Sequence, residues 1–235
     1  NAGYQVTISQ GTGANVVIPN GGIKMLVTDG AGSGAAVTDV LDMTGGTGNV
    51  GLGSGSLGTA ITTGTDNVAI GEAALDAVTT GTDNTMVGDN AGGALTTGAD
   101  NTAIGSGAFL VATTVSNHVA VGTNALAANT TGGRNTAIGK DAMLANTTGA
   151  HNVAVGEETF KANTTGNYNT AIGRFSLSSA TTADDNVAVG NSSMVANTTG
   201  ASNTAVGKSA LTANTTASNN TAVGKSALAA NTTGT

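Results

Sequence analysis

Three acidic side chains, Asp66, Asp83 and Asp100, recur at a fixed spacing and are the first candidates for a chemical site. Carboxylate oxygens aligned in this way are ligands that Ca²⁺ accepts. The same column continues with neutral, basic and aromatic residues: Asn117, Arg134, His151, Tyr168, Asp185, Ser202 and Asn219. Such variety is typical of a corner that faces solvent, and the glycine- and aspartate-rich nonapeptide of calcium-binding rolls is absent. We therefore expect a solvated corner, with a calcium-binding edge as the alternative.

His118 is the second candidate, because it alone replaces an asparagine that otherwise recurs from Asn67 to Asn220. Imidazole nitrogens bind metals and anions. If His118 faced an axis shared by three chains, three copies of it could converge on an ion. The alternative, which we prefer, is that the ring forms hydrogen bonds in place of the asparagine amide.

Two adjacent threonines recur in every repeat, from Thr79-Thr80 to Thr232-Thr233. Threonine columns suggest an ice-binding surface, but adjacent side chains of a strand point to opposite faces, so only one column could face ice. We expect a ladder of threonines at a corner of the chain. Six of the pairs complete glycosylation sequons, at Asn129, Asn146, Asn163, Asn197, Asn214 and Asn231. These sequons follow from the repeat and carry little independent information.

No catalytic constellation is found in the sequence. The chain has two His and no Cys, and its glutamates, Glu72, Glu157 and Glu158, lie at variable positions of the repeat. No nucleophile is paired with a base, and no glycine-rich phosphate loop precedes a helix. We predict that the protein is not an enzyme and has no catalytic, cofactor-binding or metal-binding residues.

The composition narrows the class of protein further. Of 235 residues 37 are Gly, three are Phe, two are Tyr and none is Trp, and only 9% are charged. An ordinary globular core needs more large apolar residues. Seven Lys and Arg in a chain of net charge −7 argue against a nucleic-acid surface. No apolar run approaches the roughly 20 residues that cross a bilayer, so we expect no membrane insertion.

All the columns above follow one period of 17 residues, marked by a glycine that closes each Asn-(Thr/Val)-Ala-(Ile/Val)-Gly block. Such a period signals a β-solenoid, in which each repeat is one coil stacked on the next. The block glycines are Gly71, Gly88, Gly105, Gly122, Gly139, Gly156, Gly173, Gly190, Gly207 and Gly224. Gly53 closes a degenerate first copy. We predict a solenoid of about eleven repeats over residues 49–235.

Residues 1–48 do not follow the period and are predicted to form a small β-domain or collar. Three segments there are rich in β-branched residues and are separated by glycine-rich turns. We expect short strands within Tyr4–Gln10, Asn15–Pro19 and Ile23–Asp29.

Within a repeat, the block before the glycine is expected to be one strand with two uncharged faces. The Ile or Val next to the glycine shares a face with the Val or Thr two residues earlier, and the Ala and Asn share the other face. A second strand is expected after the glycine, with the largest side chain of the repeat, such as Phe109 or Phe160, pointing inward.

We predict a homotrimer, because a single coil buries too few large apolar side chains to offset its backbone entropy. Small Ala side chains let backbones approach closely. The Ala and Asn face is therefore expected to pack against identical chains around an axis.

The blocks Asn67-Val-Ala-Ile-Gly, Asn101-Thr-Ala-Ile-Gly and Asn203-Thr-Ala-Val-Gly resemble the repeat core of YadA-like heads. Those heads are trimeric left-handed parallel β-rolls of bacterial autotransporter adhesins. The period here is longer, and the Thr-Thr-Gly corner is not part of their usual motif. Longer units that combine this corner with Asn-Thr-Ala-Ile-Gly resemble bacteriophage tail fibres. The segments around Tyr4, Val16 and Lys24 resemble a small β-module of phage fibre and tail proteins.

The resemblance implies an all-β, left-handed, homotrimeric β-roll that serves as a rigid segment of a bacteriophage tail fibre. Its implied location is the extracellular virion tail, and its implied partners are other phage tail proteins and a host-surface glycan or protein. Variable outer positions such as Lys161, Phe175 and Val195 are the candidates for receptor contact. The alternatives are the head of an autotransporter adhesin on a bacterial cell surface and an ice-binding or other extracellular repeat protein.

Overall fold

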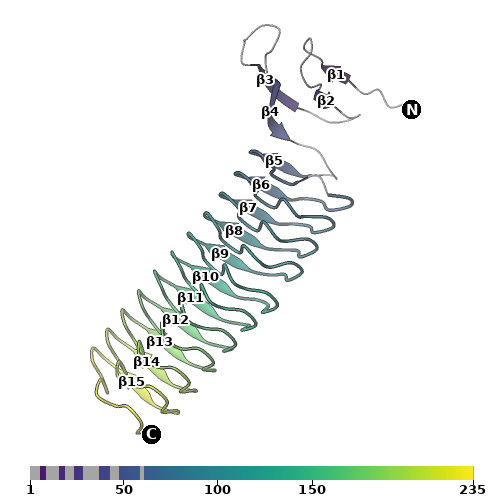
Figure 1. The fold of residues 1–235 in the computed structure, drawn as a ribbon. Coiled ribbons are helices and arrows are strands. Elements are labelled where there is room, and N and C mark those ends of the chain that lie inside the picture. The colour runs from purple at the N-terminus through teal and green to yellow at the C-terminus, as the bar shows by residue number, and fades with distance from the viewer. Residues whose placement is uncertain are drawn as a thin grey trace.

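The computed structural model describes residues 48–58 and 61–234, together with the backbone of four strands that precede them. Eleven of its strands stack in chain order into one parallel sheet (Figure 1). They are β5 (Val50–Leu52), β6 (Val68–Ile70), β7 (Thr85–Val87), β8 (Thr102–Ile104), β9 (Val119–Val121), β10 (Thr136–Ile138), β11 (Val153–Val155), β12 (Thr170–Ile172), β13 (Val187–Val189), β14 (Thr204–Val206) and β15 (Thr221–Val223). The predicted parallel β-solenoid with 17-residue coils is confirmed.

Four strands precede the solenoid: β1 (Val6–Ile8), β2 (Val16–Ile18), β3 (Lys24–Thr28) and β4 (Val37–Asp42). The first three lie within the three predicted segments, whereas β4 was not predicted. β1 pairs antiparallel with β2, β3 with β4, and β4 with β5 through Asp42 and Gly51. The remaining residues of 1–47 lie outside the described part, so a separate N-terminal domain stays a prediction.

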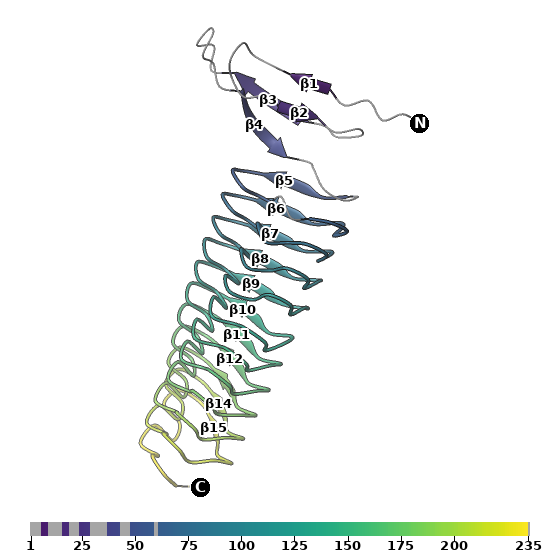
Figure 2. The same cartoon turned by 45° about the vertical axis from the view of Figure 1, so that its right-hand side comes forward.

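Each strand pairs with its own copy in the next coil, which we call a rung. Ala137 lies opposite Ala154, and Ala154 lies opposite Ala171. Only the first step differs, because Val50 pairs with Val68 across 18 residues. The backbone between strands also bonds from rung to rung, as in Leu126 N–H to Ala142 carbonyl. The stacked rungs form the rod that Figures 1 and 2 show from two sides.

The predicted orientation of the strand faces is wrong in one respect. The Ala and Asn side chains point into the chain's own coil, where Ala137, Ala154 and Asn152 have no exposed surface. The Ala and Asn face therefore cannot pack against other chains. The Ile or Val and the Val or Thr of each block point outward instead. The coil fills its own interior with small side chains because its two walls lie close together.

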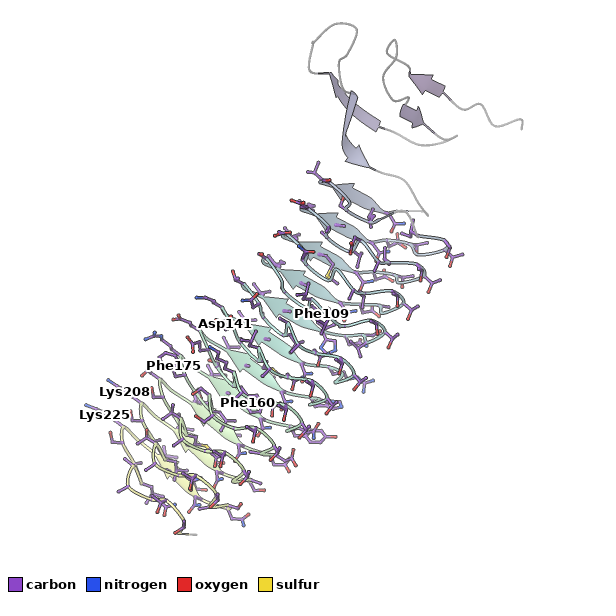
Figure 3. All side chains as sticks on the ribbon, in the orientation of Figure 1. Phe109, Asp141, Phe160, Phe175, Lys208 and Lys225 are labelled. Atoms are coloured by element: carbon purple, nitrogen blue, oxygen red, sulfur yellow. The ribbon has the colours of Figure 1, made fainter. Side chains whose placement is uncertain are left out.

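The predicted second strand is also wrong, although its large residue does point inward. Phe109 and Phe160 are fully buried between the walls of the coil (Figure 3). Their backbone is left-handed, with φ of 55° and 50°, and so is that of Asn124 (φ 56°) and Asp141 (φ 55°) in the equivalent turns of two other rungs. Left-handed residues interrupt a strand because strands require negative φ. The segment is a series of turns held by hydrogen bonds to neighbouring rungs.

A ladder of buried asparagines runs through the interior beside the sheet. The Oδ1 atom of Asn152 accepts from the backbone N–H of Asn169 at 2.9 Å and from its Nδ2 at 3.1 Å. The Nδ2 atom of Asn152 donates to the Gly166 carbonyl at 2.8 Å and to Asn135 Oδ1 at 3.3 Å. The side chain thus bonds to both adjacent rungs, and its partner Gly166 lies in the turn that precedes Asn169. Buried amides must be paired in this way, which explains why asparagine recurs.

The block glycines are required by close approach of the rungs. Gly105 has φ of +134°, and a Cβ atom on it would lie 2.6 Å from the carbonyl oxygen of Gly122. Both the conformation and the contact exclude a side chain. The same conformation recurs at every block glycine from Gly53 to Gly224.

Replacing Asn152 by Ala tests the ladder. The change leaves the buried N–H of Asn169 without its acceptor, so we expect a loss of about 3 kcal/mol in the free energy of unfolding. Asn191→Ala, the same change on the exposed edge, is expected to cost less than about 0.5 kcal/mol. Urea unfolding followed by circular dichroism measures both. Equal losses in the two variants would show that the ladder does not stabilise the rod.

Candidate functional site

The outward face of the sheet is a continuous uncharged surface along the described rungs. It is made of two columns, which we call the outer columns: the Ile or Val next to each block glycine, and the Val or Thr two residues before it. All their members in β5–β15 are Val, Thr, Ile or Leu. Ile104, Ile138 and Ile172 are 40%, 38% and 40% exposed in the single chain. Continuous apolar surface of this kind marks an interaction site.

The acidic column lies at a corner just before each strand. Asp66, Asp83 and Asp100 are exposed and left-handed, with φ of 57–58°. Asp and Asn tolerate this conformation better than most residues. The described residues contain no group of three or more His, Cys, Asp or Glu side chains that could hold a metal ion. The structure thus gives a backbone reason for aspartate at this corner, which the sequence interpretation lacked.

The same corner carries an aromatic pair farther along the rod. The rings of His151 and Tyr168 are stacked in neighbouring rungs, with centroids 5.1 Å apart and planes at 11°. Tyr168 is 62% exposed. Its amphipathic ring is the type of side chain that is enriched where proteins contact partners. Sequence reasoning placed both residues in this column but did not single them out.

The positions predicted to contact a receptor lie on other parts of the rod. Lys161 is half-buried and pairs with Glu158 at 3.1 Å. Phe175 is half-buried beneath Arg174, whose guanidinium carbon lies 4.2 Å from the ring centroid. Val195 is also half-buried. Figure 3 shows Phe175, Lys208 and Lys225 at one edge of the rod, away from Phe109 and Phe160 inside it. The three predicted positions lie in successive rungs, after Gly156, Gly173 and Gly190, and Lys161 and Val195 occupy the same place in the repeat.

The paired threonines form a corner ladder, as predicted. In most rungs the first threonine donates its hydroxyl to the carbonyl of its own copy in the next rung, as in Thr130 to Thr147 at 3.0 Å. The second, such as Thr131 or Thr148, is exposed. Only one of the two columns therefore faces solvent fully.

Five of the six sequon asparagines lie inside the coil and form two hydrogen-bonded runs, which Ala180 separates, whereas Asn231 in the last rung is half-buried. Asn129, Asn146, Asn163, Asn197 and Asn214 have no exposed surface. The Nδ2 of Asn146 donates to Asn129 Oδ1 at 2.8 Å and to the Gly149 carbonyl at 3.0 Å. In the folded chain these amides are inaccessible to a glycosylating enzyme.

His118 lies inside its own coil and is only 1% exposed. The proposal that it faces an axis shared by three chains is therefore wrong. Its Nδ1 atom accepts the N–H of Asn135 at 3.2 Å, which confirms that the ring substitutes for an asparagine oxygen. The ring also contacts Phe109, with centroids 4.8 Å apart. Its buried Nε2 atom has no hydrogen-bond partner in the described part of the chain.

Burial lowers the pKa of His118 from 6.5 to about 4, because the charged ring would lose its hydration. Backbone groups of Asn135 and Gly132 oppose this shift only in part. The imidazole is therefore neutral inside the rod at neutral pH, with Nδ1 as acceptor. This arrangement suits a structural role rather than ion binding.

The rungs also lack a concave site. No pocket is found among the residues that the structure describes. None of their segments is a helix long and apolar enough to cross a membrane.

Replacing His118 by Asn tests its role. The unfolded imidazole takes up a proton near pH 6.5 and the folded one only near pH 4, so wild-type stability falls as pH drops through this range. We expect the stability advantage of His118→Asn to grow by about 3 kcal/mol between pH 7 and pH 4. Urea unfolding across this range measures it. His151→Asn, on the exposed corner, is the matched control, and a pH-independent difference would contradict burial of a neutral ring.

Comparisons with known proteins give no relative from which to assign these surfaces. No protein-family model, curated protein or solved structure matches the chain. The uncharged outward face is therefore the candidate functional site on physical grounds alone.

Proposed function

We propose that the protein is a rigid, homotrimeric segment of an extracellular fibre, of the kind found in bacteriophage tail fibres. The observation that carries the proposal is the outward face of β5–β15, which is uncharged and partly exposed although the interior of each coil is already filled. The function is mechanical. The rod sets a distance and a direction between whatever lies at its two ends.

Stiffness follows from the direction of the hydrogen bonds. Backbone bonds between rungs run along the rod, as in Gly139 N–H to Val121 carbonyl at 2.7 Å and Gly156 N–H to Ile138 carbonyl at 2.7 Å. Bending the rod would lengthen such bonds on one side. Side-chain bonds of the buried asparagines run in the same direction. These features support a spacer rather than a flexible linker.

Self-association through the outer columns replaces the predicted contact through the Ala and Asn face. Eleven stacked strands, each three residues long and spaced about 4.8 Å apart, give a strip of about 50 by 10 Å. With its flanking turns, this strip approaches the roughly 800 Å² that each partner contributes to a standard interface. Burying it in a trimer removes the exposed Ile and Val side chains from water.

The assignment to a phage fibre rests on the resemblance of the repeat and of the N-terminal segments. It places the chain on the virion tail, beside other tail proteins, with a left-handed coil. In this proposal the variable edges of the rod contact the host surface. Tyr168, Lys208 and Lys225 are exposed there. The head of a bacterial autotransporter adhesin shares the same repeat core and is the alternative.

Replacing Ile138 by Lys tests the outward face. A charge in the apolar strip would be desolvated on association, so we expect at least about tenfold weaker trimerisation with unchanged circular dichroism. Thr148→Lys places the same charge on the exposed threonine corner and should leave the trimer intact. Light scattering against protein concentration measures both. A folded wild-type monomer at all concentrations would overturn the proposal.

A further inference from the structure

The outer columns carry a period of two rungs that no other part of the coil has. Strand triplets alternate strictly from β8 to β13, as Thr-Ala-Ile in β8, β10 and β12 and Val-Ala-Val in β9, β11 and β13. The Ile members are more exposed than the Val members that alternate with them, such as Val121 and Val155.

The alternation has no counterpart inside the rod. The Ala in the middle of each triplet points inward and is the same in all six of these strands. The largest interior residues follow another order, from Phe109 and Leu126 through Met143 to Phe160. Packing of the coil on itself therefore does not require the two-rung period.

A face built from identical rungs has a problem of register. If every rung presented the same side chains, two chains displaced by one rung would bury almost the same surface as two aligned chains. Weakly specified registers of this kind lead to slippage. A fibre needs aligned chains, because displaced chains expose unpaired rungs at their ends.

From this alternation we infer that the outer columns fix the axial register of the chains that associate through them. In a parallel assembly around the rod axis, each layer holds the same rung of every chain. Aligned chains then place threonine with threonine and valine with valine. A displacement of one rung would oppose a Thr hydroxyl to a Val methyl and an Ile to a shorter Val.

The hydroxyls make the mismatch chemically specific. Within the described residues, the hydroxyls of Thr102, Thr136 and Thr170 have no hydrogen-bond partner, whereas the corner threonines Thr130 and Thr147 bond to the next rung. Aligned outer threonines can pair across chains, as cross-strand threonines do. A methyl group opposite them would leave a buried hydroxyl unpaired.

The occupant of this face is a second copy of the same chain. The face repeats at about 4.8 Å over a strip about 50 Å long, and its alternation at about twice that spacing runs through the six strands β8–β13, about 24 Å. A partner that matches both spacings over this length must itself be a stack of rungs with the same alternation. Another copy of the chain has the same rung spacing and the same alternation, because its sequence is identical. The outer columns carry no charge, so the partner needs no complementary charge. The inference thus rests on the proposed self-association.

A phase-inverted chain tests the inference. Exchanging the two triplets throughout β8–β13 leaves the composition unchanged, because three rungs change in each direction. The substitutions are Thr102→Val, Ile104→Val, Val119→Thr, Val121→Ile, Thr136→Val, Ile138→Val, Val153→Thr, Val155→Ile, Thr170→Val, Ile172→Val, Val187→Thr and Val189→Ile. Each chain matches itself, but wild-type and inverted chains do not match in alignment.

The two full-length chains, distinguished by isotope labelling, are unfolded together, refolded and analysed by native mass spectrometry. We expect the ratio of unmixed to mixed trimers to exceed the random ratio of about 1:3 at least tenfold. Labelled and unlabelled wild type, which must mix statistically, form the control. If the inverted chain does not fold, exchanging only β10 and β11 gives a smaller bias in the same direction.

The outcomes separate the two proposals. Sorting of the chains supports the register role of the outer columns. Statistical mixing of wild-type and inverted chains overturns that role while leaving self-association in place. Monomers in every sample overturn the proposed function, and the register inference with it.

Discussion

The structure depends on one constraint, which is that the backbone of each rung must hydrogen-bond to the rungs on either side of it at equivalent positions. Parallel stacking makes the cross-sections of successive rungs identical, so any conformation adopted once is imposed on all rungs. This explains why unusual conformations persist. A left-handed residue such as Phe160 (φ 50°) is strained alone, but its N–H donates to Ser176 and its neighbours bond in the same way. The stack stabilises collectively what a single loop could not hold.

The same constraint explains the thin interior. With walls held close by the turns, one large side chain per rung suffices, and alanine and asparagine fill the rest. Asparagine is favoured because its amide can donate and accept along the rod at once. His118 meets this requirement only in part. Its Nδ1 atom accepts a hydrogen bond from the next rung, as an asparagine oxygen would, but its Nε2 atom has no hydrogen-bond partner among the described residues. Phe109 packs against the ring and compensates in part for the lost donor bond.

The sequence predicts the period, the parallel register and the inward position of the large residue, because all three follow from columns of like residues. It does not separate the two faces of the strand, since both are uncharged and short side chains fit either. The decisive feature is the asparagine, whose buried ladder places its whole face inside. The second strand was predicted from alternation alone. Gly92 and Gly107, which replace a large residue and an Asn or Asp in the turn, indicate left-handed backbone there.

A chain constrained in this way can vary only at positions whose side chains point into solvent. The residues at these positions differ between the early and the late rungs. Between residues 48 and 133 the rungs carry Asp and Glu but no Lys or Arg, because the first Lys or Arg of the solenoid is Arg134. The later rungs mix Lys140, Arg174 and Lys208 with acids and add the stacked pair of His151 and Tyr168. The rungs therefore share one backbone conformation but differ in the side chains that they expose. Because charge and aromatic side chains govern encounters between surfaces, the two halves of the rod present different chemistry to a partner.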